Sequence, residues 1–174
     1  DDLPFLSTVY KGFKFQALKG RANYFCMNHT KLNARGSAEA TALEKALSTK
    51  FAALGEGERN DVERVLRRPL TDREWSLIQG SSTGCSDFKC EADDCFSARA
   101  RALALAANIV VTNHDMLRVD ADTRSDMGEN FLGPFTYLVV DEAHTLEESL
   151  VDGWSETLSE WELNEMTTAV TAGV

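Results

Sequence analysis

Tyr137-Leu-Val-Val-Asp-Glu-Ala-His144 places two carboxylates directly after a short, continuous apolar run. A second run without polar alternation, Ile109-Val-Val-Thr112, lies upstream of it. Continuous apolar runs of this length are typical of strands that are buried on both faces of a parallel sheet. Because helical patterns lie between and around the two runs, the sequence predicts an α/β fold with part of a parallel sheet at its core.

Helical patterns fill much of the chain before the second of these runs. Ser37 can cap a helix whose apolar side chains recur at helical spacing from Leu43 to Leu54, and a shorter helix is expected at residues 61–68. Thr71-Asp-Arg-Glu74 is a capping box, in which a hydroxyl and a carboxylate satisfy free amides at a helix start. These helices lead the chain to a group of cysteines.

The segments that remain are assigned by composition. The alanine-rich run at residues 96–107 favours a helix, with Arg99 and Arg101 on its solvent side. Residues 3–15 are expected to be a strand or extended, and the polar, acidic residues 120–130 a solvated loop. Two further helices are expected at residues 145–150 and 159–170.

Charge and length restrict the class of protein. A formal net charge of -10 over 174 residues argues against coating nucleic acid by bulk electrostatics, so any such contact must be local. The best local candidate is Lys11 to Arg21, where basic residues alternate with Phe13 and Phe15 and Tyr24 follows. The alternative is a half-buried strand with Phe inside and Lys outside.

The apolar stretches are too short to cross a bilayer, which predicts a cytoplasmic protein. A start at Asp1 suggests a piece of a longer chain.

The sequence contains four cysteines, and they suggest a metal site. Cys85, Cys90 and Cys95 are separated by four residues each, and Cys26 lies far upstream. Four thiolates suit a [4Fe-4S] cluster, whose ligands are several ångströms apart, whereas zinc sites usually present tighter pairs. Structural zinc and cysteines without a ligand remain alternatives, although the neighbours of the trio are too polar for a hydrophobic core.

The acidic motif after the apolar run at residues 137–140 suggests nucleotide chemistry. Ligands bind at the carboxyl ends of parallel strands, where Asp141 can hold Mg²⁺ and Glu142 can orient and deprotonate a water. His144 can link such a site to a neighbouring lobe. The alternative is a carboxylate pair that only caps a helix.

Four stretches, in order along the chain, resemble one family, the DinG/XPD-like superfamily 2 helicases with an iron-sulfur domain. They are Lys19-Gly-Arg-Ala-Asn-Tyr-Phe-Cys26, the Cys85, Cys90 and Cys95 trio, Ser97 to Leu117, and Leu138-Val-Val-Asp-Glu-Ala-His144. The resemblance covers roughly residues 19 to 148. It implies a partial RecA-like lobe that is interrupted by a mainly helical cluster domain.

The resemblance also implies boundaries and roles. Residues 1–22 and 98–148 would belong to the RecA-like lobe, residues 23–97 to the cluster domain, and residues 149–174 to the start of an arch-like insertion. Asp141 would be a magnesium residue, Glu142 the catalytic base and His144 a coupling residue. The implied cluster ligands are Cys26, Cys85, Cys90 and Cys95, and the candidate DNA contacts are Lys19, Arg21, Tyr24, Asn113 and His114. For Asn113 and His114 the alternative is a turn at a strand end.

The sequence departs from the family pattern in having neither a Gly-x-Gly-Lys-Thr phosphate loop nor a second motor lobe. This chain alone is therefore not expected to hydrolyse ATP. The expected parent is an ATP-dependent DNA helicase, 5′ to 3′ by resemblance and active in DNA repair, which binds single-stranded or forked DNA, ATP and Mg²⁺. The alternatives are a non-catalytic nucleic-acid-binding or regulatory module and a zinc-stabilised interaction domain.

Overall fold

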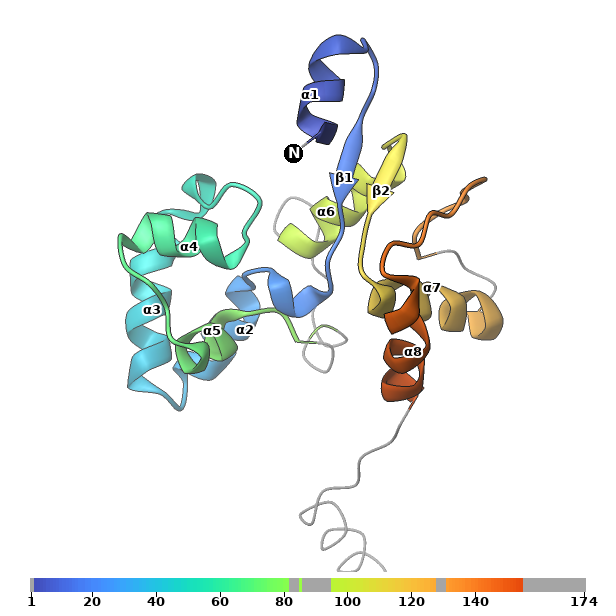
Figure 1. Ribbon diagram of the computed structural model, residues 1–174. Helices are drawn as coiled ribbons and strands as arrows, with labels where there is room; N and C mark the ends of the chain where they lie inside the picture. The colour runs from blue at the N-terminus through green and yellow to red at the C-terminus, as the bar shows by residue number, and fades with distance from the viewer. Residues whose placement is uncertain (1, 82–84, 86–94, 128–130, 155–174) are drawn as a thin grey trace, which may run out of the picture. The chain divides into compact units, whose positions relative to one another are not determined.

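The computed structural model describes residues 2–81, 85, 95–127 and 131–154, and the chain divides into two units, Asp1–Thr136 and Tyr137–Val174 (Figure 1). Most of the described residues are helical. The elements of the first unit are α1 (Asp2–Val9), β1 (Phe15–Ala17), η1 (Arg21–Asn23), α2 (Met27–Ala34), α3 (Ala38–Ser48), η2 (Phe51–Ala53), α4 (Arg59–Leu66), α5 (Asp72–Ile78), α6 (Phe96–Leu105), β2 (Ile109–Val111) and α7 (His114–Met127). The second unit contains η4 (Ala143–Thr145) and α8 (Leu146–Trp154). Across these residues, no helix is both long and apolar enough to pass through a bilayer.

A small parallel sheet joins distant parts of the first unit. β1 pairs with β2 in parallel, with Phe15 opposite Ile109 and Ala17 opposite Val111 (Figure 1). The Leu18 amide extends the pairing by donating to the Val111 carbonyl at 2.9 Å. Since parallel strands need a crossover connection, the helices between β1 and β2 form one long excursion that returns to the sheet. The predicted strand at Ile109–Val111 is confirmed, but its predicted burial on both faces is not, because Ile109 and Val111 are exposed among the described residues.

The hydrophobic core lies within this helical excursion. α3 packs on α2 and α5, and it buries Leu43 and Leu47 as the helical spacing predicts. The aromatic rings of Phe25, Phe51 and Phe96 pack together, with centroids 4.8 to 6.4 Å apart. Gly57 adopts a φ of +77°, and a side chain there would collide with the Phe96 ring, so this position requires glycine.

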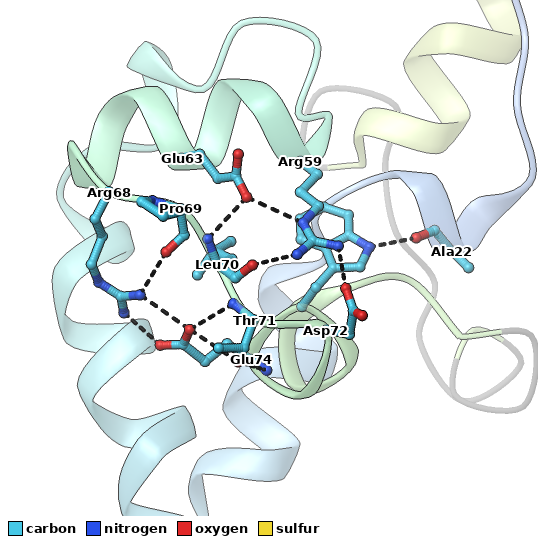
Figure 2. Close-up of polar contacts among 10 residues, drawn as sticks. Ala22, Arg59, Glu63, Arg68, Pro69, Leu70, Thr71, Asp72 and Glu74 are labelled. Atoms are coloured by element: carbon cyan, nitrogen blue, oxygen red, sulfur yellow. Dashed lines mark hydrogen bonds and ion pairs between the residues drawn. The ribbon is translucent and has the colours of Figure 1, made fainter.

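The turn between α4 and α5 is held by two arginines that converge on it (Figure 2). Arg59 binds the Asp72 carboxylate at 2.7 Å and also donates to the Leu70 carbonyl. Arg68 forms a two-point ion pair with Glu74, at 2.6 and 3.1 Å. The predicted capping box is confirmed, because Thr71 Oγ1 accepts from the Glu74 amide and a Glu74 oxygen accepts from the Thr71 amide.

Glu74 should make the stability of this turn depend on pH. The Arg68 guanidinium, together with the Thr71 amide, lowers the pKa of Glu74 from 4.5 to about 2. A carboxyl whose pKa is depressed by folding stabilises the protein above its unfolded pKa, and this contribution is lost as the pH falls towards 2. We expect Glu74→Gln to lower the free energy of unfolding by about 1 kcal/mol at pH 7. In urea titrations this difference should shrink below pH 4.5, with Glu56→Gln, which removes the same charge at an exposed site, as the control for net charge. A constant difference down to pH 3 would contradict the expectation.

Three sequence predictions are wrong for the described residues. Residues 2–9 form the helix α1 rather than an extended segment, because a short apolar run does not distinguish helix from strand and Pro4 is tolerated in a first helical turn. Residues 120–127 continue the helix α7 rather than a solvated loop. Residues 137–140 form no strand, and Tyr137 and Val139 are exposed by 89% and 91%, since a strand requires a neighbouring strand to bond its amides.

The helix α7 contains oppositely charged residues at helical spacing, a pattern that the acidic composition alone does not show. Arg118 pairs with Asp122 at 2.8 Å and Asp120 pairs with Arg124 at 2.5 Å, each four residues apart. Oppositely charged residues at this spacing face one another on a helix.

The helices predicted at residues 61–68, 96–107 and 145–150 are confirmed with small shifts at their ends. The helix predicted at residues 159–170 lies outside the described residues.

Candidate functional site

A cavity of about 340 Å³ lies in the first unit, and three of the four cysteines line it. Cys26, Cys85 and Cys95 come from positions far apart in the sequence, and each is partly exposed. The fourth predicted ligand, Cys90, lies outside the described residues. The fold therefore directs three predicted ligands to the wall of one cavity.

Two of these cysteines occupy the same position on two different helices. Cys26 is the N-cap of α2 and Cys95 the N-cap of α6, and their backbone angles agree within about 2°. Each Sγ accepts a hydrogen bond from a backbone amide three residues later, from His29 at 3.4 Å and from Ala98 at 3.5 Å. Both sulfurs therefore lie at helix N-termini, where backbone amides point towards them.

The backbone around Cys26 is held on two sides. The Cys26 amide donates to the Ile78 carbonyl at 2.8 Å, and the Gly80 amide donates to the Tyr24 carbonyl at 2.8 Å. A side chain at Gly80 would come within 2.7 Å of the Arg21 carbonyl oxygen, so the close approach requires glycine. These contacts fix the segment that carries both Arg21 and Cys26 against the end of α5.

Aromatic packing also connects the two cysteine positions. Phe25 precedes Cys26 and Phe96 follows Cys95, and both rings are buried with their centroids 6.2 Å apart. The starts of α2 and α6 are thereby held near each other by the hydrophobic core itself. The arrangement of these two sulfurs does not depend on a surface loop.

The donor set determines which group the cavity fits. Among the described residues, no three His, Cys, Asp or Glu side chains are close enough together to hold a single metal ion. A cluster in which each cysteine binds a different iron would need less closely spaced sulfurs than a single ion does. The amides that donate to Cys26 and Cys95 are also the kind of contact that tunes cluster sulfurs.

Three residues that are predicted to contact DNA lie shortly before Cys26 in the sequence. Arg21 is exposed and lines the cavity. Lys19 pairs with Glu58 at 2.6 Å. Tyr24 is 2% exposed, and its hydroxyl accepts from the Lys19 amide at 3.1 Å, while burial raises its pKa. In this arrangement the Tyr24 ring packs in the core instead of presenting a face to a base.

The other two predicted DNA contacts lie at the start of α7. Asn113 Oδ1 accepts from the Met116 amide at 3.0 Å, so Asn113 caps the helix that His114 begins. The Asn113 amide group also donates to Asp115 at 3.3 Å. The turn that the sequence offered as an alternative is thus formed, with the Asn113 side chain bonded to backbone.

The acidic motif lies in the second unit, where its side chains are exposed. Asp141 Oδ1 accepts from the Glu142 amide at 2.9 Å, and the Glu142 carboxylate lies 3.4 Å from His144 Nδ1. Glu142 has a φ of +49°, a conformation that side chains rarely adopt. The motif therefore provides carboxylate oxygens of the kind that Mg²⁺ prefers, on a sharply turned backbone.

Sequence reasoning missed one cationic element of the cavity. Arg101, expected on the solvent side of α6, is half-buried and lines the cavity. Its Nε donates to the Phe131 carbonyl at 3.2 Å, and its guanidinium lies 4.6 Å from the centre of the Phe131 ring. Arg99 and Arg101 are two positions apart, so they lie on different sides of the helix, and this spacing was the available signal.

Comparisons with known proteins agree with the resemblance. No family model matches the chain. It is 34% identical over 154 residues to the ATP-dependent helicase DinG of Mycobacterium tuberculosis and of Mycobacterium bovis, which covers 78% of this chain and 22% of each relative. It is 24% identical over 177 residues to the ATP-dependent DNA helicase YoaA of Escherichia coli, which covers 98% of this chain and 27% of that relative.

These matches identify the chain as a homologue of part of an ATP-dependent helicase. The relatives that it matches are the DinG helicases and, at lower identity, YoaA. The chain spans about a quarter of the length of the curated relatives that it matches.

Proposed function

We propose that this chain supplies the iron-sulfur domain and part of the first motor lobe of an ATP-dependent DNA helicase. The observation that carries the proposal is the cavity lined by Cys26, Cys85 and Cys95, because these three cysteines lie far apart in the sequence and share one cavity wall. The homology to DinG and YoaA supports the helicase class. We further propose that the parent translocates 5′ to 3′ and acts in DNA repair, for which the family resemblance is the support.

The proposed domain boundaries follow the sequence. Residues 23–97 would form the cluster domain, and residues 1–22 and 98–148 would belong to a RecA-like lobe, followed by an arch-like insertion. The parallel pairing of β1 with β2 across the helical excursion supports this division. Ile109 and Val111 are exposed by 38% and 45%, which fits strands that belong to a larger buried sheet in the complete lobe.

The proposed cofactor ligands are the four cysteines. Cys26, Cys85 and Cys95 would bind the cluster together with Cys90, and the amides at the starts of α2 and α6 would stabilise two of the thiolates. The cluster would act as a staple, because it joins the start of α2 to the start of α6 across the whole helical excursion. The role of the cluster in this proposal would be structural.

The proposed ATPase residues are half of a site. Asp141 would hold Mg²⁺, Glu142 would orient and deprotonate the attacking water, and His144 would couple the nucleotide to the rest of the motor. Phosphate binding would come from the parent protein. The contact between Glu142 and His144 supports a linked role for these two side chains.

The proposed nucleic-acid contacts are local. Arg21 fits best, since it is exposed at the cavity edge, and Lys19 and His114 would add contacts nearby. Asn113 would position the start of α7 through its cap, and Tyr24 would support Lys19 from the core. A single strand of DNA would thus pass close to the cluster domain.

Anaerobic purification of the chain tests the proposal. We expect a brown protein with broad visible absorption, holding about four iron atoms and an equal amount of labile sulfide per chain. Metal and sulfide analysis on the same sample measures this. A colourless protein with about one zinc per chain would overturn the cluster assignment and favour the zinc-stabilised domain.

A further inference from the structure

Two arginines line the cysteine cavity, and they differ in how firmly they are held. Arg21 is exposed, whereas Arg101 is half-buried on α6, on the helix that Cys95 begins. Charges in water are screened within about 10 Å at ordinary salt, while partly buried charges are screened much less. Of the two, Arg101 is therefore the cation with the stronger effect on any charge inside the cavity.

Phe131 fixes the position of the Arg101 side chain. The Phe131 carbonyl accepts from Arg101 Nε, and its ring lies against the guanidinium. Stacking on a ring and a directed hydrogen bond together restrict an arginine more than either contact alone. Phe131 itself lines the cavity, so the arginine and its support belong to the same wall.

A buried carboxylate anchors the segment that carries Phe131. Asp120 is 1% exposed, and it accepts from the Leu132 amide at 2.7 Å and pairs with Arg124 at 2.5 Å. Arg124 in turn donates to the Gly133 carbonyl at 2.9 Å. Residues 132 and 133 are thereby attached to α7 directly after Phe131. These contacts hold Phe131, and through it the Arg101 guanidinium, in position on the cavity wall.

We propose that Arg101 is a cofactor-facing residue, which compensates the negative charge of the group bound by the cysteines and raises its reduction potential. The inference rests on the proposed function, because a cluster with four thiolate ligands carries net negative charge. Adding an electron increases that charge, so a nearby fixed cation stabilises the reduced form more than the oxidised form. Removing the cation should make reduction harder.

The reduction potential of the anaerobically purified chain tests this assignment. We expect Arg101→Gln to disfavour the reduced cluster about tenfold, which lowers the midpoint by about 59 mV for one electron. Arg101→Lys keeps the charge and should shift the midpoint less. Titration with dithionite, followed by visible absorption and electron paramagnetic resonance, gives the midpoint, and iron and sulfide analysis confirms that each variant holds its cluster.

Arg99→Gln is the matched control, because it removes the same charge from the same helix. Arg99 donates a hydrogen bond to the Gly55 carbonyl, and its guanidinium lies 4.6 Å from the centre of the Phe96 ring. Loss of Arg99 should leave the midpoint unchanged. Equal shifts in Arg99→Gln and Arg101→Gln would overturn the proposal, since they would reflect net charge alone. An unchanged midpoint in Arg101→Gln would also overturn it, while leaving the cluster assignment intact.

A second variant keeps the test decisive if Arg101→Gln loses its cluster. Phe131→Leu retains the carbonyl that accepts from Arg101 and removes the ring that supports the guanidinium. We expect a smaller shift in the same direction, and no shift would overturn the proposal. A wild-type chain without iron and sulfide would overturn the proposed function, and this inference with it.

Discussion

Cys95→Ser should reduce the iron and sulfide content of the anaerobically purified chain at least about tenfold. Loss of an outer-shell partner costs metal sites roughly 10- to 100-fold in affinity, and loss of a ligand should cost no less. Serine is a strong N-cap, so the introduced hydroxyl can still accept from the Ala98 amide in place of Cys95 Sγ. The substitution therefore removes the thiolate and keeps the helix cap. Iron and sulfide analysis measures the result.

A matched control for helix capping is available elsewhere in the chain. Ser37 caps α3 in the same way, with its Oγ 3.2 Å from the Ala40 amide. Ser37→Ala should cost about 1 kcal/mol of stability, as loss of an N-cap does, and keep the iron content of the wild type. If both variants lost iron equally, helix capping and not ligation would explain the effect, and Cys95 would not be a ligand.

Local features of the candidate site could be predicted from the sequence, whereas its walls could not. Cysteines can be proposed as ligands from the sequence because ligand chemistry depends on residue type, and the Thr71 cap can be predicted because it involves neighbours along the chain. The burial of Arg101 cannot be predicted from its own helix because its partner Phe131 is 30 residues away in the sequence. Contacts of that kind depend on how the whole unit packs, which one sequence does not reveal.

The two errors at the apolar runs of residues 2–9 and 137–140 have a common physical cause. A short apolar run does not by itself specify helix or strand, and residues 3–9 and 137–140 are partly or fully exposed in the structure. Residues 2–9 form a helix by bonding to themselves, whereas residues 137–140 need a partner strand to form one. The prediction of a solvated loop at residues 120–127 is wrong for the opposite reason. Asp120 is buried and paired with Arg124 in spite of its charge.

Glu142→Gln in the full-length parent should lower ATP turnover at least about 100-fold and leave DNA binding unchanged. A positioned general base contributes typically about 10²- to 10⁴-fold, and glutamine keeps the shape of the side chain without its basicity. ATP hydrolysis and DNA binding by the same preparation measure the two effects. DNA binding should persist because the proposed contacts near the cysteine cavity lie in the first unit.

Unfolding would not account for such a loss. The Glu142 side chain is 71% exposed, and its contact with His144 lies at the surface, where even an ion pair contributes only about 0–1 kcal/mol. Glu148→Gln, in the exposed first turn of α8, makes the same change in charge and should leave turnover intact. Turnover retained in Glu142→Gln would remove the catalytic assignment. Equal losses in both variants would show that net charge in this segment, and not a base at residue 142, supports hydrolysis.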